Sequence, residues 1–194
     1  MANGDMKSPV RVYIGAALAR YGFGEGHPFG PDRMDAFWNE AKRQSLDRKV
    51  AIAAPEQAME EMIHRFHTSD YIERVKALSL TGEGFLDHGD TPAFKGVYEA
   101  AATVVGSGLA AVETVMCGDY PRCFIPIAGL HHARRDMAAG FCVFNDAGVL
   151  IEVLRLVHGV KRIAYAEFTR KEELVADCTP NQHSIVFQRR TQLH

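Results

Sequence analysis

Residues 123–166 read CFIPIAGLHHARRDMAAGFCVFNDAGVLIEVLRLVHGVKRIAYA. The apolar run 123–127 predicts a short strand, and the glycine-containing, charged segment 128–141 predicts a loop. A helix follows, which Asn145 is suited to cap, and its apolar residues recur at helical spacing. Residues 162–166 then predict the start of another strand. Strand, loop, helix and strand in this order are the repeating unit of a parallel sheet covered by helices.

The rest of the chain repeats this alternation. Strands are predicted over 10–14 and over 50–53, the second of them buried. Helices are predicted to begin at Pro31 and to cover 56–63, 70–78 and 92–116. The expected fold class is therefore α/β, with a largely parallel sheet and helices on both faces.

Composition excludes several classes of protein. The 194 residues carry 22 Lys plus Arg against 24 Asp plus Glu, so no broad positive field is available and we expect no nucleic-acid partner. The longest weakly polar run, 100–112, is shorter than the roughly 20 residues that span a bilayer, and we expect no membrane segment. Four cysteines form no CxxC pair, which favours reduced thiols and a cytoplasmic protein.

The adjacent His131 and His132 are the first candidates for chemistry. They follow a predicted strand, where α/β sheets place their ligands, and imidazoles there could act as acid and base. On spacing alone, two loop histidines beside a solvated Arg-Arg-Asp run are the simpler explanation of the pattern.

Other candidates also have a structural and a functional interpretation. Asp90 is most simply a turn or cap residue. Cys142 is either a nucleophile or a small buried apolar group. His64 and His67 either bind a metal from one helix face or occupy a helix end. Nucleotide binding has little support, because no complete glycine-rich phosphate motif occurs.

Five motifs occur in a fixed order along the chain. They are GHPFGPDR at 26–33, HTSDYI at 67–72, GDTPAF at 89–94, GLHHA at 129–133 and GFCVFND at 140–146. Together they resemble the histone deacetylase superfamily, above all its bacterial acetoin-utilisation and acetylpolyamine-type members, over about residues 10–166. The resemblance implies an arginase-like, three-layer α/β fold that uses zinc to hydrolyse N-acetyl amides of lysine or polyamines.

The resemblance also implies roles for individual residues. His132 matches the general base, and His131 its electrostatic and acid partner. The remaining matches are Asp90 as the rim aspartate that holds the substrate backbone, Gly140 and Phe141 as one wall of the acyl-lysine tunnel, and Arg33 as the arginine of the internal channel.

The match ends after Ala166. The family continues there with Asp-x-Asp-x-His, which supplies two zinc ligands, whereas this chain has Thr169 and Lys171 at the ligand positions. Glu167 could still reach His131, but Leu174 stands where a carboxylate should orient His132. The third ligand and the catalytic tyrosine belong to a later part of the domain. We therefore expect that this chain binds no zinc and does not deacetylate.

The sequence thus divides into an N-terminal tail (1–9), the N-terminal part of a deacetylase-like domain (10–166) and a divergent segment (167–194) expected to be poorly ordered, apart from an edge strand over 184–187. The abrupt change favours a truncated, frameshifted or fused reading frame, and an incomplete sheet predicts self-association. A pseudoenzyme module that binds acetylated amines or pairs with a partner chain is the alternative. An unrelated α/β hydrolase is disfavoured because GxSxG is absent.

Overall fold

The computed structural model describes residues 10–24, 26–166 and 187–188. Its elements, in chain order, are β1 (Val10–Tyr13), α1 (Ala16–Ala19), α2 (Arg33–Arg43), the 3-10 helix η1 (Asp47–Lys49), β2 (Ala51–Ala53), α3 (Glu60–Ile63), α4 (Ser69–Thr81), α5 (Val97–Met116), β3 (Arg122–Phe124), α6 (Asp146–Leu156) and β4 (Phe187–Gln188).

The described strands form one sheet in the order β2-β1-β3-β4. β1 lies parallel to both β2 and β3, with Val12 in register with Ile52 on one side and with Phe124 on the other. β4 pairs with β3 in the antiparallel direction, Phe187 opposite Cys123. The parallel centre confirms the predicted α/β class.

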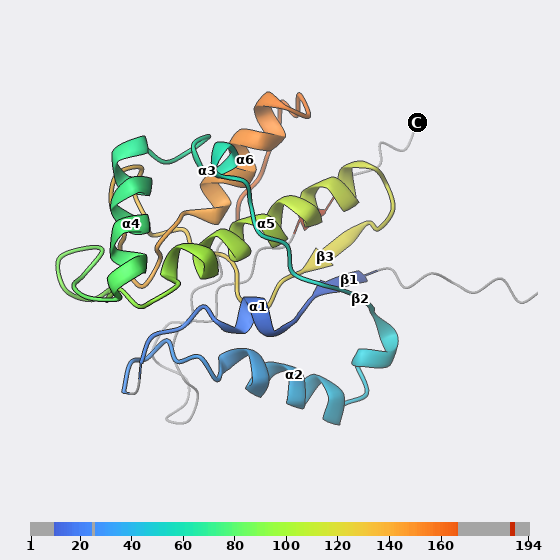
Figure 1. Ribbon diagram of the computed structural model, residues 1–194. Coiled ribbons are helices and arrows are strands. Elements are labelled where there is room, and N and C mark those ends of the chain that lie inside the picture. The colour runs from blue at the N-terminus through green and yellow to red at the C-terminus, as the bar shows by residue number, and fades with distance from the viewer. Residues whose placement is uncertain (1–9, 25, 167–186, 189–194) are drawn as a thin grey trace, which may run out of the picture.

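Helices cover both faces of this sheet (Figure 1). On one face α5 packs against β3, and the Cys123 thiol lies 3.7 Å from the Ala111 carbonyl oxygen. On the other face α2 packs against the same strand, with the rings of Phe37 and Phe124 5.4 Å apart. Successive residues of β3 therefore point to opposite layers, as the pleat of a strand requires.

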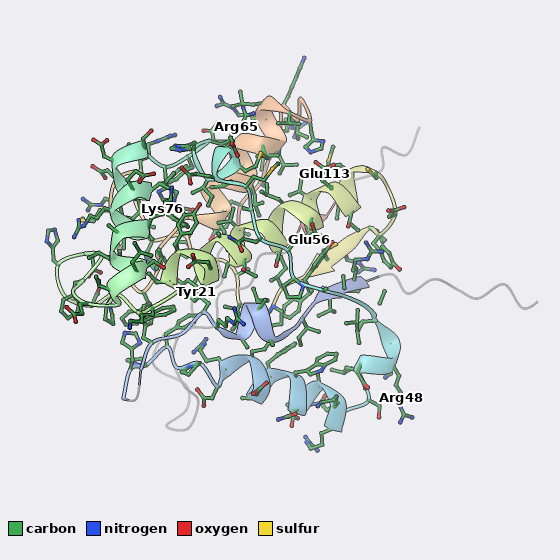
Figure 2. All side chains as sticks on the ribbon, in the orientation of Figure 1. Tyr21, Arg48, Glu56, Arg65, Lys76 and Glu113 are labelled. Carbon is green, nitrogen blue, oxygen red and sulfur yellow. The ribbon has the colours of Figure 1, made fainter. Side chains whose placement is uncertain are left out.

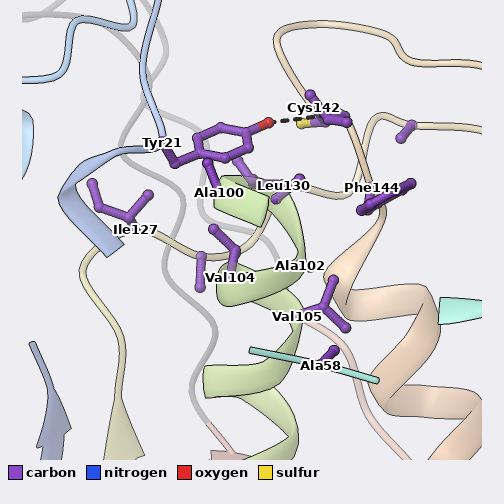
Figure 3. Close-up of a cluster of buried hydrophobic side chains, with 14 of the residues drawn as sticks. Tyr21, Ala58, Ala100, Ala102, Val104, Val105, Ile127, Leu130, Cys142 and Phe144 are labelled. Atoms are coloured by element: carbon purple, nitrogen blue, oxygen red, sulfur yellow. Dashed lines mark hydrogen bonds between the residues drawn. The ribbon is translucent and has the colours of Figure 1, made fainter. Parts of the chain in front are cut away.

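α5 is the centre of the molecule. Its alanines, valines and glycines are mostly buried, and they contact neighbours on several sides. Figure 3 shows Ala100, Val104 and Val105 among buried side chains from other elements. Gly106 allows the segment 56–58 to lie directly against the helix, because a Cβ there would come within 2.3 Å of the Glu56 carbonyl oxygen.

Two strand predictions need correction. β2 is not buried: it lies at the edge of the described sheet, and Ile52 is 55% exposed. Residues 162–166 form no strand. β3 already pairs with β1 on one edge and β4 on the other, so neither of its edges is open to this segment.

Two helix predictions were too long. The helix expected over 56–63 covers only Glu60–Ile63, because the Ala58 backbone N–H donates to Ala102 of α5 instead of continuing a helix. The long helix begins at Val97, not near Pro92. Its N-cap, Gly96, has a φ of 84°, a conformation that glycine adopts readily.

The sequence predicted neither α1 nor η1, and the strand predicted over 123–127 is shorter, Arg122–Phe124. α2, α4 and α6 form where the sequence predicted helices, and β1 forms at the predicted N-terminal strand. An ion pair from Lys76 of α4 to Glu60 of α3, 2.9 Å long, joins two of these helices, and Figure 2 shows Lys76 on α4. No helix in 10–24 and 26–166 is both long enough and apolar enough to cross a membrane. β4 includes Phe187 of the predicted edge strand, while the rest of 167–186 lies outside the described residues.

Candidate functional site

The loop from 125 to 144, which follows β3, carries both histidines. The His131 and His132 rings lie with their centroids 4.3 Å apart at an angle of 40°. His132 is exposed, whereas His131 is half-buried. Nδ1 of His131 lies 3.1 Å from the carbonyl oxygen of Gly129 and 2.8 Å from the Tyr165 hydroxyl.

Asn145 connects this histidine loop (129–135) to α6. Its side-chain oxygen accepts from the Gly148 N–H at 2.7 Å, which confirms the predicted helix cap. Its side-chain amide donates to the carbonyl oxygens of His131, at 2.8 Å, and Ala133, at 2.9 Å. One side chain therefore caps the helix and holds the backbone of the histidine loop at two points, His131 and Ala133.

Asp146, the first residue of α6, binds the other end of the loop. Its carboxylate accepts from the backbone N–H of Gly129 at 2.8 Å and of Ala147 at 2.6 Å. The side chain is fully enclosed, and burial raises its pKa to about 6 against the opposing effect of these N–H donors. Its place at the N-terminus of a helix also favours the ionised form.

His67, between α3 and α4, is a structural histidine and not a metal ligand. Nε2 accepts from the Asn145 N–H at 2.9 Å, so the ring hydrogen sits on Nδ1, which donates to the Arg135 carbonyl oxygen at 3.2 Å. Burial lowers the pKa of His67 to about 4, so the ring is neutral at neutral pH. The neighbouring His64 lies instead on the surface beside Glu60, 3.5 Å away.

The wall expected at Gly140 and Phe141 is a tight turn held from below. Both residues have positive φ, 54° and 66°. The Tyr21 hydroxyl donates to the Phe141 carbonyl oxygen at 2.7 Å and accepts from the Val143 N–H at 2.9 Å, and Figure 3 shows it directed at this segment. A Cβ on Gly140 would lie 3.0 Å from the His132 ring, so glycine allows the wall and the histidine to meet.

The rim around Asp90 is a second hydrogen-bonded turn. The Asp87 carboxylate accepts from the backbone N–H groups of Gly89, Asp90 and Thr91. Burial opposes ionisation of Asp87, but these bonds and that from the Thr91 hydroxyl hold its pKa well below the usual range. The adjacent Asp87 carboxylate in turn raises the pKa of Asp90.

Thr91 joins this rim to the wall. Its side chain is fully buried, and its hydroxyl donates to the Asp87 carboxylate at 2.6 Å while it accepts from the Phe141 N–H at 3.2 Å. His27 adds a second connection, since its Nε2 lies 3.3 Å from the Asp90 carbonyl oxygen and its ring packs on Phe141.

A cleft of about 440 Å³ opens between rim and wall, lined by residues 87–90, Arg134 and residues 137–140. It brings together Asp90 and Gly140, two of the residues singled out in the sequence. Four other residues singled out in the sequence are not among its lining residues: Arg33, His131, His132 and Phe141. The Arg33 guanidinium lies 4.3 Å over the Phe29 ring, which in turn packs on Tyr21. Burial lowers the pKa of Arg33.

In the part of the chain that the structure describes, no three His, Cys, Asp or Glu side chains are grouped so that they could hold a metal ion. Thr169 and Lys171 stand where the resemblance predicts zinc ligands, and both lie outside the described residues.

Sequence reasoning missed the residues that support the site. His67 was considered only as a helix-end residue or metal ligand, and Asp146, Asp87 and Tyr21 were given no role. The sequence offered only a weak sign of these supporting roles. His67 and Asp146 belong to two of the five motifs, and aspartate at the start of a helix is common.

The fold and this site define a class of protein, an α/β domain with a largely parallel sheet whose loop after β3 carries a histidine pair and lines a cleft. Residues 27–168 match the histone deacetylase domain. The chain therefore belongs to the histone deacetylase family.

Individual relatives agree with this assignment. The acetoin utilization protein AcuC of Bacillus subtilis is 32% identical over 169 residues, which cover 84% of this chain and 43% of the relative. A histone deacetylase-like amidohydrolase of Pseudomonas aeruginosa is 31% identical over 144 residues, 74% of this chain and 38% of the relative.

A solved structure shows the same fold. The crystal structure of the HDA15 HD domain superposes with a TM-score of 0.70 at 21% identity and covers 77% of this chain and 44% of that one. This chain thus spans less than half the length of these relatives, and the similarity to the solved structure bears on the fold.

Proposed function

We propose that this chain carries the entrance and the histidine loop of a deacetylase-like amidohydrolase site for N-acetylated amines, acetyl-lysine or acetylated polyamines, and that by itself it does not hydrolyse them. The observation that carries the proposal is that Gly140, which lines the cleft together with Asp90, lies so close to the His132 ring that a Cβ there would come within 3.0 Å of it. Family membership supports the substrate class.

Each described part has a task in such a site. The turn at Gly140 and Phe141 forms one wall for an acyl-amine stem, and Asp90 at the rim can accept a hydrogen bond from an amide N–H or an amine. In the proposed site His132 is the base that takes a proton from water, and His131 is its partner. In a complete site of this family zinc polarises the amide carbonyl.

Hydrolysis fails in this chain because the metal-binding positions have the wrong chemistry. Thr169 and Lys171 replace a carboxylate and an imidazole, and a lysine adds positive charge where a cation would bind. Without a polarised carbonyl, an imidazole base alone leaves most of the barrier to amide hydrolysis in place.

Metal analysis and a deacetylase assay on the full chain with added zinc test this proposal. We expect less than one zinc per chain and no turnover of acetyl-lysine peptide or acetylated polyamine above that of His132→Ala. His158→Ala, on a half-buried histidine that pairs with Glu113, is the matched control. Chelator-sensitive turnover that His132→Ala abolishes and His158→Ala keeps would overturn the proposal.

A second candidate function is a binding module without catalysis, which could pair with a partner chain. The cleft between rim and wall favours it, because that cleft is formed by residues the structure describes. Calorimetric titration with an acetylated polyamine tests this candidate: measurable binding that Asp90→Asn weakens supports a binding module, and heat no greater than dilution argues against one. We place the protein in the cytoplasm, which its free Cys117, Cys123 and Cys142 support.

A further inference from the structure

His27 contacts both sides of the cleft. Its Nε2 lies 3.3 Å from the carbonyl oxygen of Asp90 at the rim, and its ring meets Phe141 of the wall edge to face with centroids 4.5 Å apart. Its Nδ1 accepts a hydrogen bond from the backbone N–H of Phe29 at 3.0 Å. His27 is not among the residues that line the cleft, so its effect on a bound molecule passes through Asp90 and Phe141.

The partners of the two ring nitrogens fix the state of the imidazole. A backbone N–H only donates, so the bond from Phe29 requires a lone pair on Nδ1. A carbonyl oxygen only accepts, so the bond to Asp90 requires a hydrogen on Nε2. The neutral imidazole with its hydrogen on Nε2 makes both bonds, whereas the other tautomer makes neither and the protonated ring loses the bond from Phe29.

The loop that carries His27 has its own anchors. The Phe23 N–H donates to the Phe29 carbonyl oxygen at 2.8 Å, and the backbone N–H of His27 donates to the Gly24 carbonyl oxygen at 3.1 Å. Phe23 and Phe29 are buried, and their rings pack edge to face on Tyr21. The loop therefore presents the imidazole from a fixed base, because these contacts do not involve the rim.

The Asp90 turn is tied to this loop. The bonds of the Asp87 carboxylate to the N–H groups of residues 89–91 stay within the turn, and Thr91 fastens its end to the wall. The bond from His27 holds the backbone of Asp90 itself to a segment 63 positions away. Internal bonds give the turn its shape, and the bond from His27 ties it to the same ring that packs on the wall.

We propose that His27 is a positioning residue for Asp90: its Nε2–H holds the Asp90 backbone while its ring packs on Phe141, so that rim and wall keep one spacing. The carboxylate of Asp90 then stands at a fixed place in the lining of the cleft. That it receives an acetylated amine there rests on the proposed function, whereas the positioning itself does not.

Two substitutions separate the two bonds of the imidazole. In His27→Asn the side-chain oxygen replaces Nδ1 and can accept from Phe29, but the shorter side chain has no donor at the position of Nε2. In His27→Gln the side-chain nitrogen replaces Nε2 and can donate to Asp90, but no acceptor faces Phe29. Both variants lose the ring, so each is the matched control for the other.

Amide hydrogen exchange of the full chain, followed residue by residue by NMR, measures the result. We expect the N–H groups of residues 89–91 to exchange about fivefold faster in His27→Asn than in His27→Gln, the factor that a hydrogen bond of ordinary net strength gives. The Phe29 N–H should show the reverse order. Long-range ¹H–¹⁵N spectra of the unaltered chain with ¹⁵N-labelled histidine, recorded at about pH 8, should show a pyridine-type Nδ1 and a pyrrole-type Nε2 for His27.

Two results would overturn the proposal: a pyrrole-type Nδ1 on His27 in the unaltered chain, or equal exchange of residues 89–91 in the two variants. Circular dichroism checks that both variants fold. If either does not, the spectrum of the unaltered chain still decides, because the bond to Asp90 needs a hydrogen on Nε2. The experiment uses neither substrate nor turnover, so its failure and the failure of the amidohydrolase proposal are distinguishable.

Discussion

Three buried polar side chains, His67, Asn145 and Asp146, hold the histidine loop through bonds to its backbone. A hydrogen bond contributes about 1 kcal/mol net, but a buried donor or acceptor left without a partner costs about 1–3 kcal/mol. Replacement of any one of the three therefore leaves several backbone groups unsatisfied and loosens the loop.

His67 should make stability depend on pH. Its pKa is about 4 when folded and near 6.5 when unfolded, so its contribution is complete above pH 6.5 and is lost as the pH falls toward 4. We expect His67→Gln to be less stable than the unaltered chain at neutral pH and the difference to shrink by roughly 3 kcal/mol toward pH 4. Urea denaturation at several pH values measures it, and a difference independent of pH would contradict a buried neutral His67.

Asp146 should make stability depend on pH in the opposite direction from His67. Burial raises its pKa to about 6, so the folded state takes up a proton before the unfolded state does, and its contribution grows as the pH falls from 6 toward 4. Asp146→Asn loses one acceptor for a backbone N–H, and we expect its deficit in unfolding free energy to widen over this range. The same denaturation series checks the sign, and a deficit that narrows would show that Asp146 is ionised throughout.

At the scale of elements, close packing of α5 decides how the layers meet. Gly106→Ala would improve helix propensity by about 1 kcal/mol, yet its Cβ would collide with the backbone of residues 56–58. We expect a net loss of about 2 kcal/mol or more. Gly108→Ala, whose Cβ meets only the Leu150 side chain at 2.9 Å, is the matched control and should cost less. Thermal unfolding of both variants compares their stabilities. Equal midpoints would mean that the backbone of residues 56–58 can shift away from the new Cβ at little cost.

For the whole molecule, the open edge of the described sheet predicts self-association. β2 lies at that edge with Ile52 55% exposed, and an unpaired strand edge readily pairs with another copy. We expect light scattering at micromolar concentration to give a mass above the 21.5 kDa of one chain. Ile52→Lys should lower that mass, while Met59→Lys, on an exposed residue outside the sheet, should not. A compact monomer would contradict this expectation.

Much of the framework follows from local pattern. Helical spacing and caps predicted α2, α4 and α6, and the Asn145 cap forms as expected because capping depends on neighbours three residues apart. The predictions over 56–63 and 162–166 failed because their outcome depended on α5 and on the edges of β3. For the candidate site, the motifs singled out the histidine pair and the turn at Gly140 and Phe141, but not the side chains that hold them.

The sequence by itself determined the α/β order of elements, the family and the identity of the residues at the histidine loop, because periodicity, caps and motifs are properties of near neighbours in the chain. The tertiary structure alone decided that His67 meets Asn145 across 78 positions, that Thr91 joins rim to wall, and that Tyr165 reaches His131. These contacts arise when packed layers bring distant segments together, and no local pattern encodes which buried polar groups will then need each other as partners.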